Sequence, residues 1–167
     1  MKETNTIIIL KYMSEKNKFI LKDNSRTEHQ KMVMEKINEE GHCPFCPENL
    51  DKYHKKPILK EGKFWLLTDN QWPYENVKNQ LLAIYKKHIE HIREMESGAS
   101  DELIELFAEE AKKRNIPGGA VCMRFGSNPN KGDYGSTVLH LHAHLIEPDL
   151  ENPKKEKIKF KIGQPKE

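Results

Sequence analysis

The sequence predicts an α+β fold, with a largely antiparallel sheet of about five strands, a main helix over residues 100–115 and a smaller helix near His91. Three observations predict it. Within residues 138–146, three histidines alternate with apolar residues, as expected for a strand with one buried face. Aromatic and apolar runs predict further strands over 63–68, 80–85 and 120–125. Apolar residues recur at helical spacing after the capping Ser100 and two acids.

Composition narrows the class of protein. The 167 residues suit one domain, and a hydrophobic content of 36% supplies one core. A formal net charge of +2 argues against a general nucleic-acid-binding protein. No apolar run could span a membrane, and the N-terminus does not resemble a secretory signal peptide. Three cysteines, two of them in a C-x-x-C, suit a reducing compartment, so we expect a cytoplasmic protein.

We divide the chain into an N-terminal extension (1–40) that packs on the core, a central domain (41–150) and a lysine-rich tail (151–167). The extension is expected to hold a short strand over Thr6–Leu10, with residues 18–21 available to pair with it. Lysine alternates with apolar residues over 154–162, which predicts a final edge strand in which lysine deters aggregation.

The extension also contains the signature of a helix. Ser25 and Glu28 have the spacing of a capping box, which predicts a helix from about Arg26 to Glu40. Gly41 is a suitable stop for this helix. The apolar residues available for its buried face are Met32, Val33 and Ile37.

The most informative stretch is His140-Leu141-His142-Ala143-His144, in which three histidines alternate with apolar residues. On a strand all three imidazoles project from the same face, with neighbours roughly 6.5–7 Å apart. One histidine can then act on a substrate while its neighbours orient it, polarise the substrate or hold a metal. The alternative is a polar-faced strand that happens to use histidine.

Cys43 and Cys46 form a C-x-x-C knuckle around Pro44 and Phe45. The tight turn brings both sulfurs to one side, where they can bind one metal ion. A redox pair and two ordinary thiols are the alternatives, although the βαβ pattern that accompanies most redox pairs is missing. Zinc needs four ligands, so histidines would have to complete the site.

The segment 126–137 precedes the histidine row and is rich in glycine, asparagine and small hydroxyl residues. Such a loop leaves backbone N–H groups free to approach phosphate oxygens. A flexible hairpin loop is the alternative. The residues that we expect to bind substrate are Asn128, Gly135, Ser136 and Thr137.

The row His140–Ile146 resembles the motif of the histidine triad (HIT) superfamily, His-φ-His-φ-His-φ-φ with φ apolar. The resemblance extends less sharply over roughly residues 40–148. It implies a HIT-like fold, a nucleotide-binding catalytic domain over 41–150, a purine nucleotide as substrate and a homodimer as the common assembly.

HIT proteins with an N-terminal C-x-x-C complete a structural zinc site with a histidine closing a central strand and the first triad histidine. The ligands that this resemblance implies are Cys43, Cys46, His88 and His140. Tyr85 stands where the strand motif has proline, and His91 is the alternative to His88. His42 and His54 match no ligand position, so we expect them on the surface.

The resemblance also implies a mechanism. His142 is the expected nucleophile, which attacks an α-phosphorus to form a covalent nucleotidyl-histidine, and His144 assists the phosphoryl oxygens or the leaving group. Histidine at the third triad position is typical of hydrolases, so the implied substrate is a nucleoside phosphoramidate or a dinucleoside polyphosphate. Ser136 replaces the glutamine of hydrolase members, so the glutamine's phosphate contact does not carry over.

Two other functions stay open. Pro73-Tyr74-x-Asn76 resembles a loop of the galactose-1-phosphate uridylyltransferase and dinucleotide phosphorylase branch, which favours transfer to an acceptor other than water. We weigh this loop less because it is expected to lie outside the reacting atoms. A nucleotide-binding module with little turnover is the alternative from another class.

Overall fold

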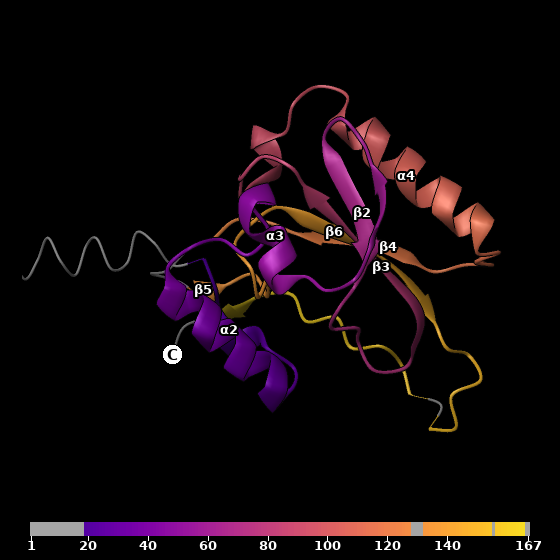
Figure 1. The fold of residues 1–167 in the computed structure, drawn as a ribbon. Helices are drawn as coiled ribbons and strands as arrows, with labels where there is room; N and C mark the ends of the chain where they lie inside the picture. The colour runs from indigo at the N-terminus through magenta and orange to yellow at the C-terminus, as the bar shows by residue number, and fades with distance from the viewer. Residues whose placement is uncertain (1–18, 128–131, 155, 166–167) are drawn as a thin grey trace, which may run out of the picture.

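The computed structural model describes residues 19–127, 132–154 and 156–165. Its centre is a five-stranded antiparallel sheet with the strand order β1-β2-β3-β6-β4 (Figure 1). The strands are β1 (Ile58–Glu61), β2 (Trp65–Asp69), β3 (Val77–Tyr85), β4 (Ala120–Arg124) and β6 (His142–Pro148). The predicted fold class and strand number are therefore confirmed.

Both faces of the sheet are covered (Figure 1). On one face, Leu103, Leu106 and Phe107 of α4 (Ala99–Lys113) share a core with alternate residues of β2, β3 and β6. On the other face, Leu50 of α3 (Pro47–Tyr53) packs with residues of β2 and β3. The strand that carries the histidines is thus buried on both faces up to its last residue. The expectation of a single buried face was wrong, because α3, which precedes the sheet in the chain, covers the face on which the histidines lie.

Helix α2 (Glu28–Glu40) begins two residues later than predicted, because Thr27 caps it and Ser25 does not. Thr27 Oγ1 accepts a hydrogen bond from the Gln30 N–H at 3.1 Å. Gly41 ends the helix in the left-handed conformation at φ 71°, as predicted. Met32 is 61% exposed, so its assignment to the buried face was wrong. The buried side chains of α2 are Gln30, Met34 and Ile37.

The remaining helices were predicted unevenly. α4 agrees with the predicted main helix within two residues, although Gly98 occupies its N-cap in place of a serine. The small helix near His91 is a single 3-10 turn, η2 (Ile92–Glu94). Helix α3 was not predicted, although Pro47 at its first turn is a known helix-start signal. A further 3-10 turn, η1 (Lys22–Asn24), precedes α2.

Near both ends of the described chain, short segments form β pairs outside the central sheet. Thr6–Leu10 lies outside the described residues, and Ile20 forms its β-bridge with Val138. The predicted edge strand over 154–162 is wrong for the described residues of that segment, whose Phe160 packs on Tyr74 with ring centroids 5.8 Å apart. Further on, β7 (Gln164–Pro165) pairs with β5 (Gly132–Asp133). None of the helices in the described ranges is long and apolar enough to cross a membrane.

Candidate active site and metal site

The histidine row lies where β6 enters the sheet. His142 and His144 are opposite Ile84 and Leu82 of β3, and directly opposite residues share a face. Both imidazoles therefore lie on the face covered by α3. Their ring centroids are 5.2 Å apart at an interplanar angle of 90°. His140 precedes the strand and contacts the cysteine pair.

Hydrogen bonding fixes the tautomer of His142. Its Nδ1 lies 2.6 Å from the backbone oxygen of His140, which can only accept, so Nδ1 carries the proton. The lone pair is then on Nε2. Burial lowers the pKa of His142 to about 4, so the ring is neutral at pH 7. A neutral imidazole with one free nitrogen is a competent nucleophile.

His144 is held in the opposite tautomer by Gln80, a residue that sequence reasoning missed. The Tyr74 N–H donates to Gln80 Oε1 at 2.7 Å, which turns the amide nitrogen of Gln80 toward His144. That nitrogen donates to His144 Nδ1 at 3.3 Å, so the ring proton of His144 is on Nε2. Burial, followed by the effects of His142 and Arg124, lowers the pKa of His144 well below its ordinary value. The two histidines thus offer one lone pair and one N–H donor.

The four predicted zinc ligands form one cluster. The ligand atoms of Cys43, Cys46, His88 and His140 all lie within 4.8 Å of one another. His140 Nδ1 is 3.3 Å from Cys43 Sγ, 3.9 Å from Cys46 Sγ and 3.2 Å from His88 Nδ1. In a tetrahedral site with Zn–N of about 2.0–2.1 Å and Zn–S of about 2.3 Å, ligand atoms are roughly 3.3–3.8 Å apart. The donor set and its spacing therefore fit zinc.

The surroundings of the cluster agree with this fit. His140 Nε2 donates to the backbone oxygen of Tyr85 at 2.5 Å, which leaves Nδ1 free to face the other ligands. His91, the alternative ligand, lies elsewhere and accepts a hydrogen bond from the Arg93 N–H. His42 bonds to Tyr53 and is also outside the cluster.

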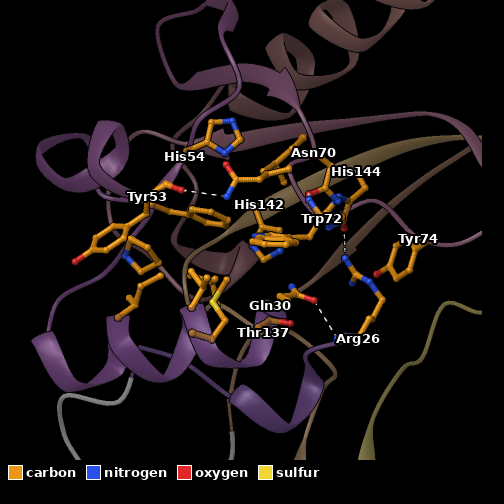
Figure 2. Close-up of a pocket in the computed structure, with 18 of the residues that line it drawn as sticks. Arg26, Gln30, Tyr53, His54, Asn70, Trp72, Tyr74, Thr137, His142 and His144 are labelled. Atoms are coloured by element: carbon orange, nitrogen blue, oxygen red, sulfur yellow. Dashed lines mark hydrogen bonds between the residues drawn. The ribbon is translucent and has the colours of Figure 1, made fainter. Parts of the chain in front are cut away.

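A cavity above the histidines is lined by side chains from α2, α3 and the loop after β2 (Figure 2). Its volume is about 60 Å³. Among the described residues that line it with His142 and His144 are Arg26, Phe45, Tyr53, His54, Asn70, Trp72 and Tyr74.

Several residues that line the cavity were expected elsewhere or were not singled out from the sequence. His54, expected on the surface, lines the cavity and its Nε2 lies 2.8 Å from Thr68 Oγ1. Tyr74 was expected outside the reacting region, yet its ring centroid is 6.2 Å from that of His144. Arg26 and Trp72 were not singled out, and no local pattern marks either one. The guanidinium of Arg26 donates to the Trp72 backbone oxygen and joins the start of α2 to this wall (Figure 2).

The glycine-rich loop is less open than expected. Asn128 lies outside the described residues. The Gly135 N–H donates to Asp133 Oδ1 at 2.6 Å, so it is engaged within the loop. Ser136 is buried, and its backbone oxygen accepts from Asn24. Of the four predicted substrate-binding residues, Thr137 alone among those described lines the histidine cavity.

The chain is similar to one known family and to several solved structures. A family model described as "Scavenger mRNA decapping enzyme C-term binding" matches residues 42–160. A Zn-bound histidine triad family protein from Mycobacterium smegmatis has 16% sequence identity and a TM-score of 0.50, covering 71% of this chain and 82% of that one. A HIT family hydrolase from Clostridium thermocellum has 22% identity and a TM-score of 0.48, covering 67% and 95%. No curated protein matches the sequence.

Proposed function

Since the chain belongs to the family described as "Scavenger mRNA decapping enzyme C-term binding" and has the histidine triad fold, we propose that it hydrolyses nucleotides at the α-phosphate. The observation that carries this proposal is the pairing of opposite tautomers at His142 and His144. One ring offers a lone pair and its neighbour offers an N–H, as nucleophilic displacement at phosphorus requires.

The proposed reaction has two displacements. His142 Nε2 attacks the α-phosphorus and forms a P–N bond, while the bond from phosphorus to the leaving group breaks and its electron pair departs with that group. His144 Nε2–H donates a hydrogen bond to an α-phosphoryl oxygen and stabilises the charge that develops there, while its proton stays on the ring. Water then attacks the same phosphorus, the P–N bond breaks with its electron pair returning to His142 Nε2, and the proton of the water is released to solvent. This step frees the nucleoside monophosphate and restores neutral His142.

Transfer to another acceptor is the second candidate. The position of Tyr74 beside His144 favours it, because the loop that resembles the uridylyltransferase branch then lies at the cavity. Both candidates share the covalent step and differ only in what attacks the nucleotidyl-histidine. Analysis of products formed with and without inorganic phosphate separates them, since phosphorolysis yields a nucleoside diphosphate where hydrolysis yields a monophosphate.

We also propose that Cys43, Cys46, His88 and His140 hold one structural zinc ion. Four protein ligands close such a site, so the ion would supply rigidity and would not bind substrate. Its place between the cysteine knuckle and His140 supports a role in fixing the start of β6. The His140 backbone oxygen that orients His142 belongs to the same segment.

Phosphate and assembly complete the proposal. The predicted role of Gly135, Ser136 and Thr137 in binding the phosphates stays a prediction, and the place of Thr137 in the cavity wall supports it for that residue. We further propose a cytoplasmic homodimer. The position of β4 at the sheet edge, with Val121 50% exposed, leaves a strand for a second copy to contact.

AMP is expected to bind with measurable heat at neutral pH and to raise the melting temperature. Trp72 lines the cavity with His142 and His144, so a purine bound there is expected to contact its indole ring. Binding should therefore change tryptophan fluorescence. Trp65 is 0% exposed in the core on the opposite face and should contribute a constant signal.

Titration of Trp72→Phe provides the control, since it retains only Trp65 and should lose the fluorescence change. Calorimetry and melting curves with millimolar AMP measure binding independently of fluorescence. Absence of both heat and thermal shift for the wild-type protein would contradict nucleotide binding.

A further inference from the structure

Two arginines flank Tyr74 at the border of the histidine cavity. The Cζ atom of Arg26 lies 4.2 Å from the Tyr74 ring centroid, and that of Arg124 lies 6.0 Å from it. Arg124 Nη1 also donates to the Tyr74 hydroxyl oxygen at 2.9 Å. Arg124 is opposite His142 in the pairing of β4 with β6, so its backbone lies beside that of the proposed nucleophile.

Within the described residues, neither guanidinium forms an ion pair with a carboxylate. Among the arginines of the described segments, only Arg114 forms ion pairs with carboxylates. Arg26 donates to a backbone oxygen, and Arg124 Nε donates to the Lys161 backbone oxygen at 2.8 Å. Packing around the Arg26 guanidinium lowers its pKa, although the residue keeps an exposed edge. Two close cations without carboxylate partners create a site that favours a multivalent anion.

A second cavity continues from this pair. Its volume is about 320 Å³, and it shares Arg26, Tyr74 and Arg124 with the histidine cavity. Its charged lining consists of five cationic side chains, Arg26, Arg124, Lys157, Lys159 and Lys161, and three acidic ones, Asp23, Glu75 and Glu156. The lysines come from the C-terminal tail, which reaches this wall through contact of Phe160 with Arg124. The lining of this second cavity thus carries more positive than negative charge.

We propose that Arg26 and Arg124 are specificity-determining residues that bind the phosphates beyond the α-phosphate, and so make the site prefer a polyphosphate to a phosphoramidate. This inference rests on the proposed function, because it assumes that the α-phosphorus is at His142. The leaving group of a polyphosphate is a phosphate chain that gains negative charge on its bridging oxygen as the P–O bond breaks. A cation pair stabilises that charge, whereas the neutral amine released from a phosphoramidate has no use for one.

A purely structural role for the pair makes a different prediction. If Arg26 and Arg124 only join α2, the loop at Tyr74 and the tail, their loss should impair both substrate classes alike. Substrate discrimination therefore separates the two roles. The measurement is the ratio of kcat/KM for diadenosine tetraphosphate to kcat/KM for adenosine phosphoramidate.

In Arg26→Gln and Arg124→Gln this ratio is expected to fall by about tenfold or more. For the tetraphosphate, KM should rise or kcat should fall more than for the phosphoramidate. Arg26→Lys should recover part of it, because charge returns without the planar fork. Arg93→Gln, in the exposed η2 turn, is the matched control and should keep the wild-type ratio. Melting curves establish that each variant is folded. An unchanged ratio in both glutamine variants would overturn the proposal.

A binding assay separates failure of this inference from failure of the proposed function. If the wild-type protein turns over neither substrate, the proposed function fails, but the arginine pair can still be tested with α,β-methylene-ATP and AMP. Calorimetry should give tighter binding of the triphosphate analogue, and Arg26→Gln should reduce that preference. Equal affinity of the wild-type protein for both probes would overturn the assignment of the arginine pair.

Discussion

Replacing His142 with alanine is expected to lower nucleotide turnover by several orders of magnitude while the protein stays folded and still binds AMP. Alanine removes the nitrogen that forms the covalent intermediate, and no neighbouring group can take its place. His144 is already held as an Nε2–H donor by Gln80, so it has no free lone pair directed to the reaction. Steady-state rates, melting curves and AMP calorimetry on one preparation test the three parts of this expectation.

The other two triad histidines provide the comparison. His144→Ala should be milder, because removing one hydrogen-bond donor to the developing charge typically costs about 10²–10³-fold. His140→Ala should lower metal content and thermal stability together with activity, because it removes a proposed ligand. An inactive His144→Ala beside a substantially active His142→Ala would require the assignment of the nucleophile to be abandoned.

Loss of zinc is expected to have the second largest effect. Protein expressed with added zinc should contain about one equivalent per chain, and Cys43→Ala should contain far less. A ligand present at a thousand times its dissociation constant stabilises the native state by about 4 kcal/mol. In a domain of this size each kcal/mol shifts Tm by roughly 2–4 °C, so chelation should lower Tm by roughly 10 °C.

Cys122 supplies a matched control, because it is also a free cysteine but lies on β4 outside the cluster. Cys122→Ala should keep its zinc content, whereas Cys43→Ala and chelated wild-type protein should melt early. The folded fraction of Cys43→Ala should keep more of its intrinsic rate than of its stability, since the ion is not a reactant. Zinc far below one equivalent in the wild-type protein after expression with added metal would contradict the site.

The strands and the histidine row could be predicted because their signals are local. The alternation around the histidines and aromatic runs such as 63–68 indicate strands from local sequence. Their bounds are less certain, since β6 begins only at His142, and β1 was not predicted. The cysteine pair is also local. The meeting of His88 with His140, 52 positions later, could be expected only through resemblance to the triad family.

The features that were missed depend on tertiary contacts. Ser25 and Thr27 are both favoured N-cap residues, with serine ranked ahead of threonine, so residue type alone does not select the observed cap Thr27. Arg26 and Trp72 reach the cavity from segments 46 residues apart, and neither lies in a recognisable motif. The tail over 154–162 has a strand pattern in the sequence. Its Phe160 nevertheless lies outside any strand and packs on Tyr74 and Arg124. Such positions follow from the assembled fold and not from periodicity.

The central claim is that catalysis proceeds through a covalent bond between phosphorus and His142. Single-turnover labelling tests it most directly: the enzyme in excess is mixed with diadenosine tetraphosphate radiolabelled at the α-phosphates and quenched at successive times. We expect a labelled protein band that appears before the labelled AMP, is lost in His142→Ala and maps to the peptide that contains His142. Stoichiometric formation of AMP without labelled protein at any time would contradict the account.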